Sequence, residues 1–175
     1  QVVAFARTGE ALGIDREEIL LVGQNGENFK SLVVEGKGFT GSWSPTGEKL
    51  LYSTYSNRSD FKPELWITDA TVDTIGGNRR PLSVNTWPEK CTFGSDRYVY
   101  CAVPRELSTG AGFAPELANT TPDDLYRIDL ASGIRTQIPL NEEQTITIQS
   151  IQVDEARGML YFTDPNQQGL YQVAL

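Results

Sequence analysis

Short runs of β-branched and aromatic residues alternate with clusters of turn-forming residues along the whole chain. Such runs, when bounded by glycine, proline, asparagine and aspartate, predict β-strands. Clear turn signals lie at 24–26, 44–47, 75–78 and 131–133. The apolar spacing of an α-helix is poor, and we expect helical turns only at 15–19 and within 105–118. The pattern therefore predicts an all-β protein.

The expected strands group into four units, at 1–37, 38–86, 87–140 and 141–175. Their strands are expected at 2–7, 18–23 and 29–34; at 39–43, 49–54, 65–69 and 80–84; at 90–94, 98–103, 125–129 and 135–139; and at 146–153, 159–163 and 170–174. A leucine or isoleucine recurs in one strand of each unit, at Ile19, Leu65, Leu125 and Leu170. Apart from one insertion at 104–123, this spacing is close to the roughly 40–45 residues of a four-stranded propeller blade.

The predicted fold is a single domain over 1–175 made of β-propeller blades of four antiparallel strands, about 3.5 blades in all. The first unit lacks an innermost strand and the last unit lacks an outermost one. Propellers typically have four to eight blades, so the chain either closes as a small four-bladed ring or forms part of a larger propeller. We expect the larger propeller, because an open stack would expose apolar surface at both ends. The remaining blades would come from the rest of the polypeptide or from another chain.

Two motifs carry a family resemblance. Residues 43–52, with the sequence WSPTGEKLLY, resemble the W-S-P-D-G-K-x-I-x-Y/F signature of TolB-like, WD-repeat-like propeller repeats. Residues 64–69 (ELWITD) and 124–129 (DLYRID) resemble the x-L-W-x-x-D strand of the same repeat. The resemblance covers roughly residues 18–175 and departs at Thr46, where the repeat has aspartate, and at 94–97, where GSDR replaces SPDG.

The chain also resembles membrane-tethered bacterial propeller proteins of unassigned function. This resemblance rests on Lys90 with Cys91 and on residues 100–104, with the sequence YCAVP. It implies a cell-surface or periplasmic location and a tether that lies outside this chain.

The charge and composition of the chain exclude several classes of function. The net charge of −8 argues against nucleic-acid binding, which needs cations to neutralise phosphates. The chain has no histidine, which removes Ser-His-Asp and Cys-His catalysis and histidine-ligated zinc. No run of 18 apolar residues is present, so we expect no membrane contact within this chain. We expect no metal, no cofactor and no enzymatic activity of the chain itself.

Cys91 and Cys101 are the only cysteines. If residues 95–97 form a three-residue hairpin loop, the two cysteines lie directly opposite each other on neighbouring antiparallel strands, within reach of a disulfide. Two buried free thiols are the alternative. We expect the disulfide, which would indicate an oxidising, extracytoplasmic compartment.

Two loops are the candidate binding surface. The insertion at 104–123 joins the second and third strands of its blade, and loops longer than about 12–15 residues are often functional. The shorter loop at 55–63 occupies the same position in the preceding blade, so we expect both loops on one face. A loop that only packs on its own blade is the alternative. The candidate residues are Arg58, Asp60, Lys62, Arg105, Glu106, Phe113, Asp123 and Asp124.

Acidic groups could hold calcium or act as an acid–base pair, but none has a recognised spacing. These groups are Asp123 with Asp124, Asp15 with Glu17 and Glu18, and Glu142 with Glu143. We expect solvated carboxylates at these positions. The sequence therefore favours a non-catalytic extracytoplasmic propeller that binds a protein or a glycan through its loop face. The alternatives are an accessory propeller of a hydrolase, such as a prolyl-oligopeptidase-like peptidase, and a carboxylate-based glycosidase.

Overall fold

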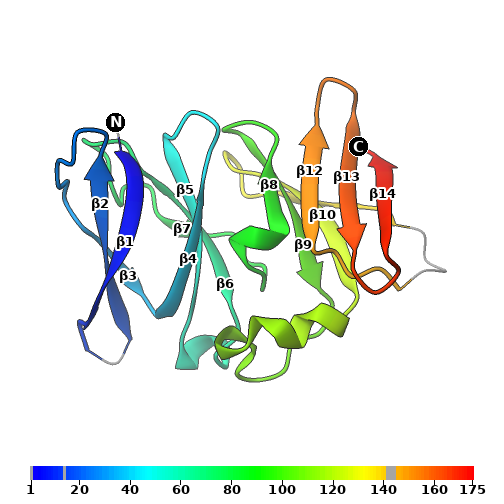
Figure 1. The fold of residues 1–175 in the computed structure, drawn as a ribbon, viewed down its shortest axis with the longest axis horizontal. Coiled ribbons are helices and arrows are strands. Elements are labelled where there is room, and N and C mark those ends of the chain that lie inside the picture. Colours follow the sequence, from blue (N-terminus) through cyan, green and yellow to red (C-terminus); the bar gives the residue numbers. More distant parts are fainter. Residues whose placement is uncertain (1, 14, 141–144) are drawn as a thin grey trace.

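Four small antiparallel sheets make up the computed structural model, which describes residues 2–13, 15–140 and 145–175 (Figure 1). The first sheet contains β1 (Val2–Ala11), β2 (Arg16–Gly23) and β3 (Leu32–Glu35); the second contains β4 (Lys37–Trp43), β5 (Lys49–Tyr55), β6 (Glu64–Asp69) and β7 (Arg80–Pro81). The third contains β8 (Cys91–Phe93), β9 (Tyr98–Pro104), β10 (Asp123–Asp129) and β11 (Arg135–Ile138); the fourth contains β12 (Ser150–Asp154), β13 (Met159–Asp164) and β14 (Gly169–Ala174). Apart from Lys37, the first residue of β4, each sheet falls within one of the four units expected from the sequence.

Strands that follow one another in the chain also pair with one another in every sheet. The short polar turns, such as Ser44–Gly47 with its Gly47 N to Ser44 O hydrogen bond of 2.9 Å, allow this simple up-and-down order. Strand β5 is buried from Leu50 to Thr54, and both faces of its sheet are therefore covered. The sequence of a strand that is covered on both faces is typically a continuous apolar run, as residues 50–52 (LLY) are in β5.

In the part of the chain that the structure describes, three apolar clusters fill the spaces between successive sheets. Ile19, Leu21 and Val34 of the first sheet meet Leu50 and Tyr52 of the second. The next cluster joins the second sheet to the third and contains Leu51, Leu65, Ile67, Val99, Cys101 and Ile128. The last joins the third sheet to the fourth and contains Tyr100, Leu125, Ile148, Ile151, Leu160 and Phe162. Each sheet is thus stabilised by burying apolar side chains against its neighbour.

The row of sheets is open. Figure 1 shows the first sheet at one end of the molecule and the fourth sheet at the other. Among the described residues, no apolar cluster joins these two sheets, so the small four-bladed ring is not formed. The end sheets consequently present large apolar side chains to solvent, with Leu20 37% exposed in the first and Leu170 74% exposed in the fourth.

Several local expectations were wrong, each for a physical reason. The helical turn expected at 15–19 is absent, because residues from Arg16 onward pair with β1 and β3. Strand β7 is only two residues long, because Ser83 has φ 56° and leaves the extended conformation. The last unit begins its first strand at Ser150 instead of 146, because the amides of Thr147 and Ile148 bond to aspartate side chains. Lys90 belongs to a 3₁₀-helix instead of a strand.

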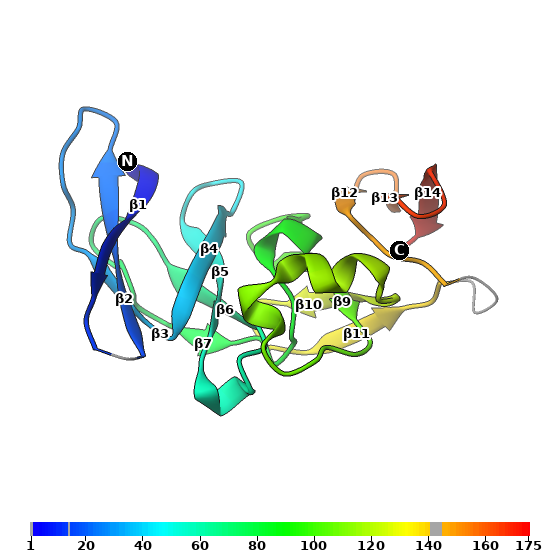
Figure 2. The same cartoon turned by 60° about the horizontal axis from the view of Figure 1, so that its bottom comes forward.

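Among the described residues, four 3₁₀-helices lie outside the sheets: η1 (Asn57–Ser59), η2 (Pro88–Lys90), η3 (Ala111–Phe113) and η4 (Pro115–Thr120). Helices η3 and η4 belong to the insertion, where the sequence predicted short helical turns. They lie along one edge of the row of sheets, and this edge comes forward in Figure 2. This edge, formed by the loops at 55–63 and 104–123 and by the chain that enters β8 and β12, is called the loop face below.

Candidate binding face and its cleft

The two long loops lie side by side on the loop face, as the sequence predicted. The amide of Gly110 donates to the Asp60 carbonyl at 2.9 Å, and the amide of Gly112 donates to the Phe61 carbonyl at 2.7 Å. The ring of Phe113 lies 5.2 Å from that of Phe61, between ring centroids. The insertion of the third sheet therefore packs on the second sheet, which corrects the alternative in which it packs only on its own blade.

A close approach of the chain at Gly112 makes this contact possible. A Cβ atom placed there would lie 2.6 Å from the ring and the Cβ of Tyr55, nearer than real Cβ atoms come. The same tyrosine ring lies 4.6 Å from Phe113, between centroids. The insertion is thus fixed to the second sheet by two backbone hydrogen bonds and an aromatic group.

The candidate residues of the shorter loop make separate contacts. Arg58 forms an exposed ion pair with Glu35 of the first sheet, with 2.7 Å between Nη2 and Oε2. Asp60 has φ 53° at the end of η1, and its carbonyl holds the insertion. The amide of Lys62 closes the turn by donating to the Ser59 carbonyl at 2.9 Å. Arg58 thus joins this loop to the first sheet, while the backbone of Asp60 and Lys62 shapes the loop itself.

The candidate residues at the two ends of the insertion have separate surroundings. Arg105 pairs with Asp124, with 2.8 Å between Nε and Oδ1. Arg105 and Glu106 also line a hollow of about 540 Å³ together with Leu117 and Pro122. Phe113 remains 59% exposed although it packs on the neighbouring loop.

Asp123 is the most deeply buried of the candidates. Its Oδ2 accepts hydrogen bonds from Lys90 Nζ and from the Ile148 amide, both at 2.7 Å, and its side chain is fully buried. Burial raises the pKa of Asp123 above its usual range even though Lys90 acts in the opposite direction. The other oxygen, Oδ1, has no hydrogen-bond partner within the described chain. Asp123 therefore ties the base of the insertion to η2 and to the segment that enters β12.

A cleft of about 400 Å³ opens beside this buried pair, between η2 and η4. Its walls come from β4, from the segments that enter β8 and β12, and from the insertion. Its polar side chains are Thr40, Glu89, Lys90, Glu116, Asn119 and Gln149. Trp87, Pro115, Ala118 and Ile148 supply the apolar part of the lining. Thr40 Oγ1 donates to Glu89 Oε2 at 3.4 Å, and Trp87 keeps 6% of its surface exposed.

The sequence missed most of this cleft. Glu89 was expected in the connection before the strand at 90–94, and Gln149 was expected within the strand at 146–153, whereas both lie just before β8 and β12. The signal that could have found them is topological: chain entering an innermost strand begins on the same face as the loops at 55–63 and 104–123. Glu116 lies within the insertion, but no motif distinguished it from the other polar residues there.

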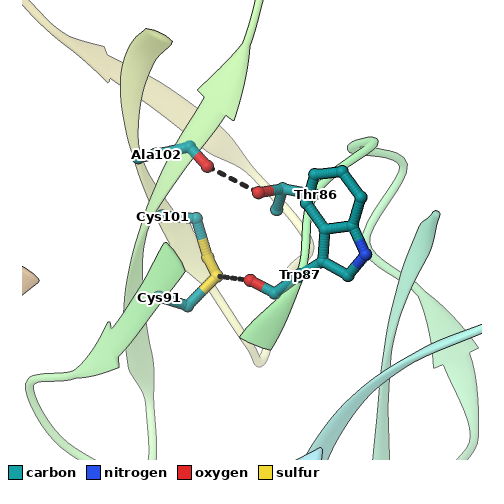
Figure 3. The surroundings of a disulfide bond; sticks show 5 residues. All are labelled: Thr86, Trp87, Cys91, Cys101 and Ala102. Carbon is teal, nitrogen blue, oxygen red and sulfur yellow. Dashed lines mark hydrogen bonds between the residues drawn. A yellow bond between two sulfur atoms is a disulfide. The ribbon is translucent and has the colours of Figure 1, made fainter. Parts of the chain in front are cut away.

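A disulfide joins Cys91 to Cys101 in the third sheet, with 4.1 Å between the Cα atoms (Figure 3). The two residues are direct partners across β8 and β9, in the register predicted from the hairpin loop. The Trp87 carbonyl oxygen lies 3.5 Å from Cys91 Sγ, and this is an S···O contact because a disulfide sulfur has no proton to donate. The carbonyl of Ala102 accepts a 2.6 Å hydrogen bond from Thr86 Oγ1. These contacts hold the segment before η2 against the disulfide-linked strands.

The acidic groups considered from the sequence do not converge. Within residues 2–13, 15–140 and 145–175, no group of three or more Cys, Asp or Glu side chains is placed to hold a metal ion. Glu17 Oε2 accepts a hydrogen bond from the Phe39 amide at 3.0 Å and so joins the first two sheets. Glu142 and Glu143 lie outside the described residues. The described helices are all too short to cross a membrane.

The sheets define an all-β protein built from propeller-like blades, and comparison with known proteins agrees on the fold. No protein-family model matches the chain, and no curated protein matches its sequence. Among solved structures, the chain is similar to hydrazine synthase of Kuenenia stuttgartiensis, with a TM-score of 0.51 and 13% identity over 90% of this chain and 46% of that chain. The chain thus spans less than half of the hydrazine synthase chain, and the likeness concerns the propeller-like blades alone.

Two further solved structures are more distant. The tricorn protease gives a TM-score of 0.49 and 9% identity over 98% of this chain and 19% of its own. A conserved lipoprotein of Clostridium novyi NT gives a TM-score of 0.44 and 9% identity over 91% of this chain and 92% of its own.

Proposed function

We propose that this chain is a non-catalytic binding module of an extracytoplasmic propeller, and that its binding surface is the loop face. The observation that carries the proposal is the cleft between η2 and η4. Its walls come from β4 of the second sheet, from the segments that enter β8 and β12 of the third and fourth sheets, and from the insertion. A concave site with apolar walls and a few convergent polar groups, built where several elements meet, is the usual form of a ligand site.

The construction of the insertion supports this proposal. Arg105 with Asp124 and Lys90 with Asp123 fix its two ends, while Gly110 and Gly112 fix its middle. Binding residues are often carried on loops that a rigid scaffold positions. The insertion is therefore a positioned surface, and a partner would bind it without having to order it first.

The disulfide supports the proposed compartment. Disulfides persist in oxidising surroundings and are rare in the cytosol of mesophiles. Because Cys101 is buried in the cluster between the second and third sheets, the Cys91–Cys101 bond belongs to the core of the module. An extracytoplasmic location, at the cell surface or in the periplasm, is consistent with this.

The outer sides of the two end sheets support the proposal that further blades belong to the propeller. The exposed Leu20 and Leu170 lie on the outer sides of the two end sheets, where successive sheets elsewhere in the row bury such side chains. We propose that blades from the same polypeptide or from another chain cover both end sheets. Propellers with closed rings leave only short, protected edges, and the open row lacks that protection.

Site-specific photocrosslinking in the intact protein tests the proposal. A photoreactive residue at Asn119, on the cleft, should give a defined crosslinked product in cells. The matched control is Glu48, an exposed residue in the β4–β5 turn at the opposite edge of the second sheet, which should give none. Equal labelling at both positions, or none at Asn119, would contradict a binding role for the loop face. Hydrolysis of peptide or glycoside substrates that is lost in Glu89→Gln or Glu116→Gln would contradict the non-catalytic assignment.

A further inference from the structure

The charges in the cleft are unbalanced. Its titratable lining groups are Glu89, Glu116 and Lys90. Within the described part of the chain, no ion pair joins Glu89 or Glu116 to a cation. Glu89 accepts only the long 3.4 Å hydrogen bond from Thr40, and both glutamates are exposed.

Lys90 does not neutralise them. Its ammonium group donates to Asp123 Oδ2 at 2.7 Å, and only 12% of its side chain is exposed. Asp123 itself is fully buried behind the cleft wall and contributes one negative charge to match that cation. The charges that remain to face an incoming ligand are therefore the two carboxylates of Glu89 and Glu116.

The uncharged lining suits a particular kind of ligand. Trp87 and Pro115 provide aromatic and aliphatic walls, and Asn119 and Gln149 provide amide groups. The aliphatic stem of a long basic side chain can pack on such walls while its charged head reaches a carboxylate. Arginine gains further from a site of this type, because its planar group donates two parallel hydrogen bonds to a carboxylate and stacks on aromatic surfaces.

We propose that the cleft between η2 and η4 receives a basic side chain, arginine or lysine, presented by a protein partner. This assignment rests on the proposed function of the loop face and specifies its ligand chemistry. The carboxylates of Glu89 and Glu116 bind the cation, and the wall that contains Trp87 holds the stem. The Lys90 ammonium, which also lines the cleft, is bound by Asp123.

The test is calorimetric titration of the intact protein with two pentapeptides. One peptide carries a central arginine between glycines with blocked ends, and the other carries citrulline, which has nearly the same shape without the charge. The arginine peptide should bind, and the double variant Glu89→Gln/Glu116→Gln should weaken its binding at least tenfold. Raising the salt concentration should weaken binding further, because exposed charges are screened. Glu48→Gln is the matched control and should bind the arginine peptide as the unmodified protein does.

Each contrary outcome has a distinct meaning. Equal binding of the citrulline peptide, no binding of the arginine peptide, or binding that survives the double variant would overturn the assignment. Binding of neutral oligosaccharides in place of the arginine peptide would overturn it in favour of a glycan. If photocrosslinks at Asn119 persist while the peptide titration fails, the binding role of the loop face stands and only the basic ligand is wrong. Thermal unfolding of the double variant checks that the fold is retained, which we expect because both glutamates are exposed.

Discussion

The buried pair of Lys90 and Asp123 yields the sharpest prediction. The carboxylate of Asp123 is fully buried, with 0% side-chain exposure, and its Oδ2 accepts two hydrogen bonds. The side chain of Lys90 remains 12% exposed beside the cleft. Replacing Lys90 by Met leaves a buried carboxylate without its cation, and we expect a loss of about 3–5 kcal/mol in the free energy of unfolding at pH 7. Asp123→Asn should cost less, because the unpaired ammonium of Lys90 can turn toward the solvent in the cleft.

The double variant distinguishes pairing from simple loss of contacts. Burial raises the pKa of Asp123 despite Lys90, so desolvation outweighs the attraction between the two charges. Removing both charges in Lys90→Met/Asp123→Asn should therefore restore much of the stability lost in Lys90→Met alone. The assay is urea unfolding of the four proteins, compared at equal m-values. Losses that simply add in the double variant would refute the coupling.

The pH dependence of the Lys90→Met variant gives an internal check. Without the ammonium, the pKa of Asp123 should rise further, and the folded state should bind a proton that the unfolded state releases near its ordinary pKa of 3.8. Stability contributed by this group is then present at low pH and lost as the pH rises through the raised pKa. The deficit of the variant should be smaller at pH 5 than at pH 7. An equal deficit at both values would contradict the burial argument.

Three further predictions test other parts of the fold. Cys91→Ala/Cys101→Ala should lower the free energy of unfolding by about 2–3 kcal/mol, because the disulfide closes a short loop; an unchanged denaturation midpoint would contradict this. Hydrogen bonds from Arg97 and from the amides of Ala131 and Ser132 hold the pKa of Asp129 at about 2, so its stabilising contribution should be present above pH 3.8 and lost as the pH falls toward 2. Asp129→Asn should flatten the dependence of the melting temperature on pH in this range. An unchanged pH dependence would contradict a stabilising role of the Asp129 carboxylate. Phe113→Ala should speed amide exchange at Gly110 and Gly112, because the rings of Tyr55 and Phe61 lose their partner; unchanged exchange would show that the insertion is held without it.

The strand pattern and the register of the disulfide could be predicted from the sequence, because both depend on local signals. Alternation and turn residues placed the strands near β5, β9 and β13, and a three-residue loop was enough to set Cys91 opposite Cys101. Local sequence signals did not predict the backbone conformation where it is set by hydrogen bonds from a side chain distant in the sequence. The carboxylates of Asp123 and Asp164 capture the amides of Ile148 and Thr147, and no property of residues 146–149 themselves reveals that.

The cleft was beyond prediction for a similar reason. Its members come from β4, η2, η4 and the segment before β12, and only the stacking of three sheets brings them together. Asp123 was a candidate from the sequence as an exposed acidic residue of a loop, whereas in the structure it is a buried anchor. The two glutamates that line the cleft, Glu89 and Glu116, both precede Asp123 in the chain.

We propose above all that these four sheets are blades of a larger propeller whose loop face binds a partner. The most direct measurement is an experimental structure of the intact protein. We expect further blades to cover the outer sides of the first and fourth sheets and to bury Leu20 and Leu170, while the cleft between η2 and η4 stays open on the loop face. A structure in which both leucines remain in solvent, or in which another blade fills the cleft, would contradict it.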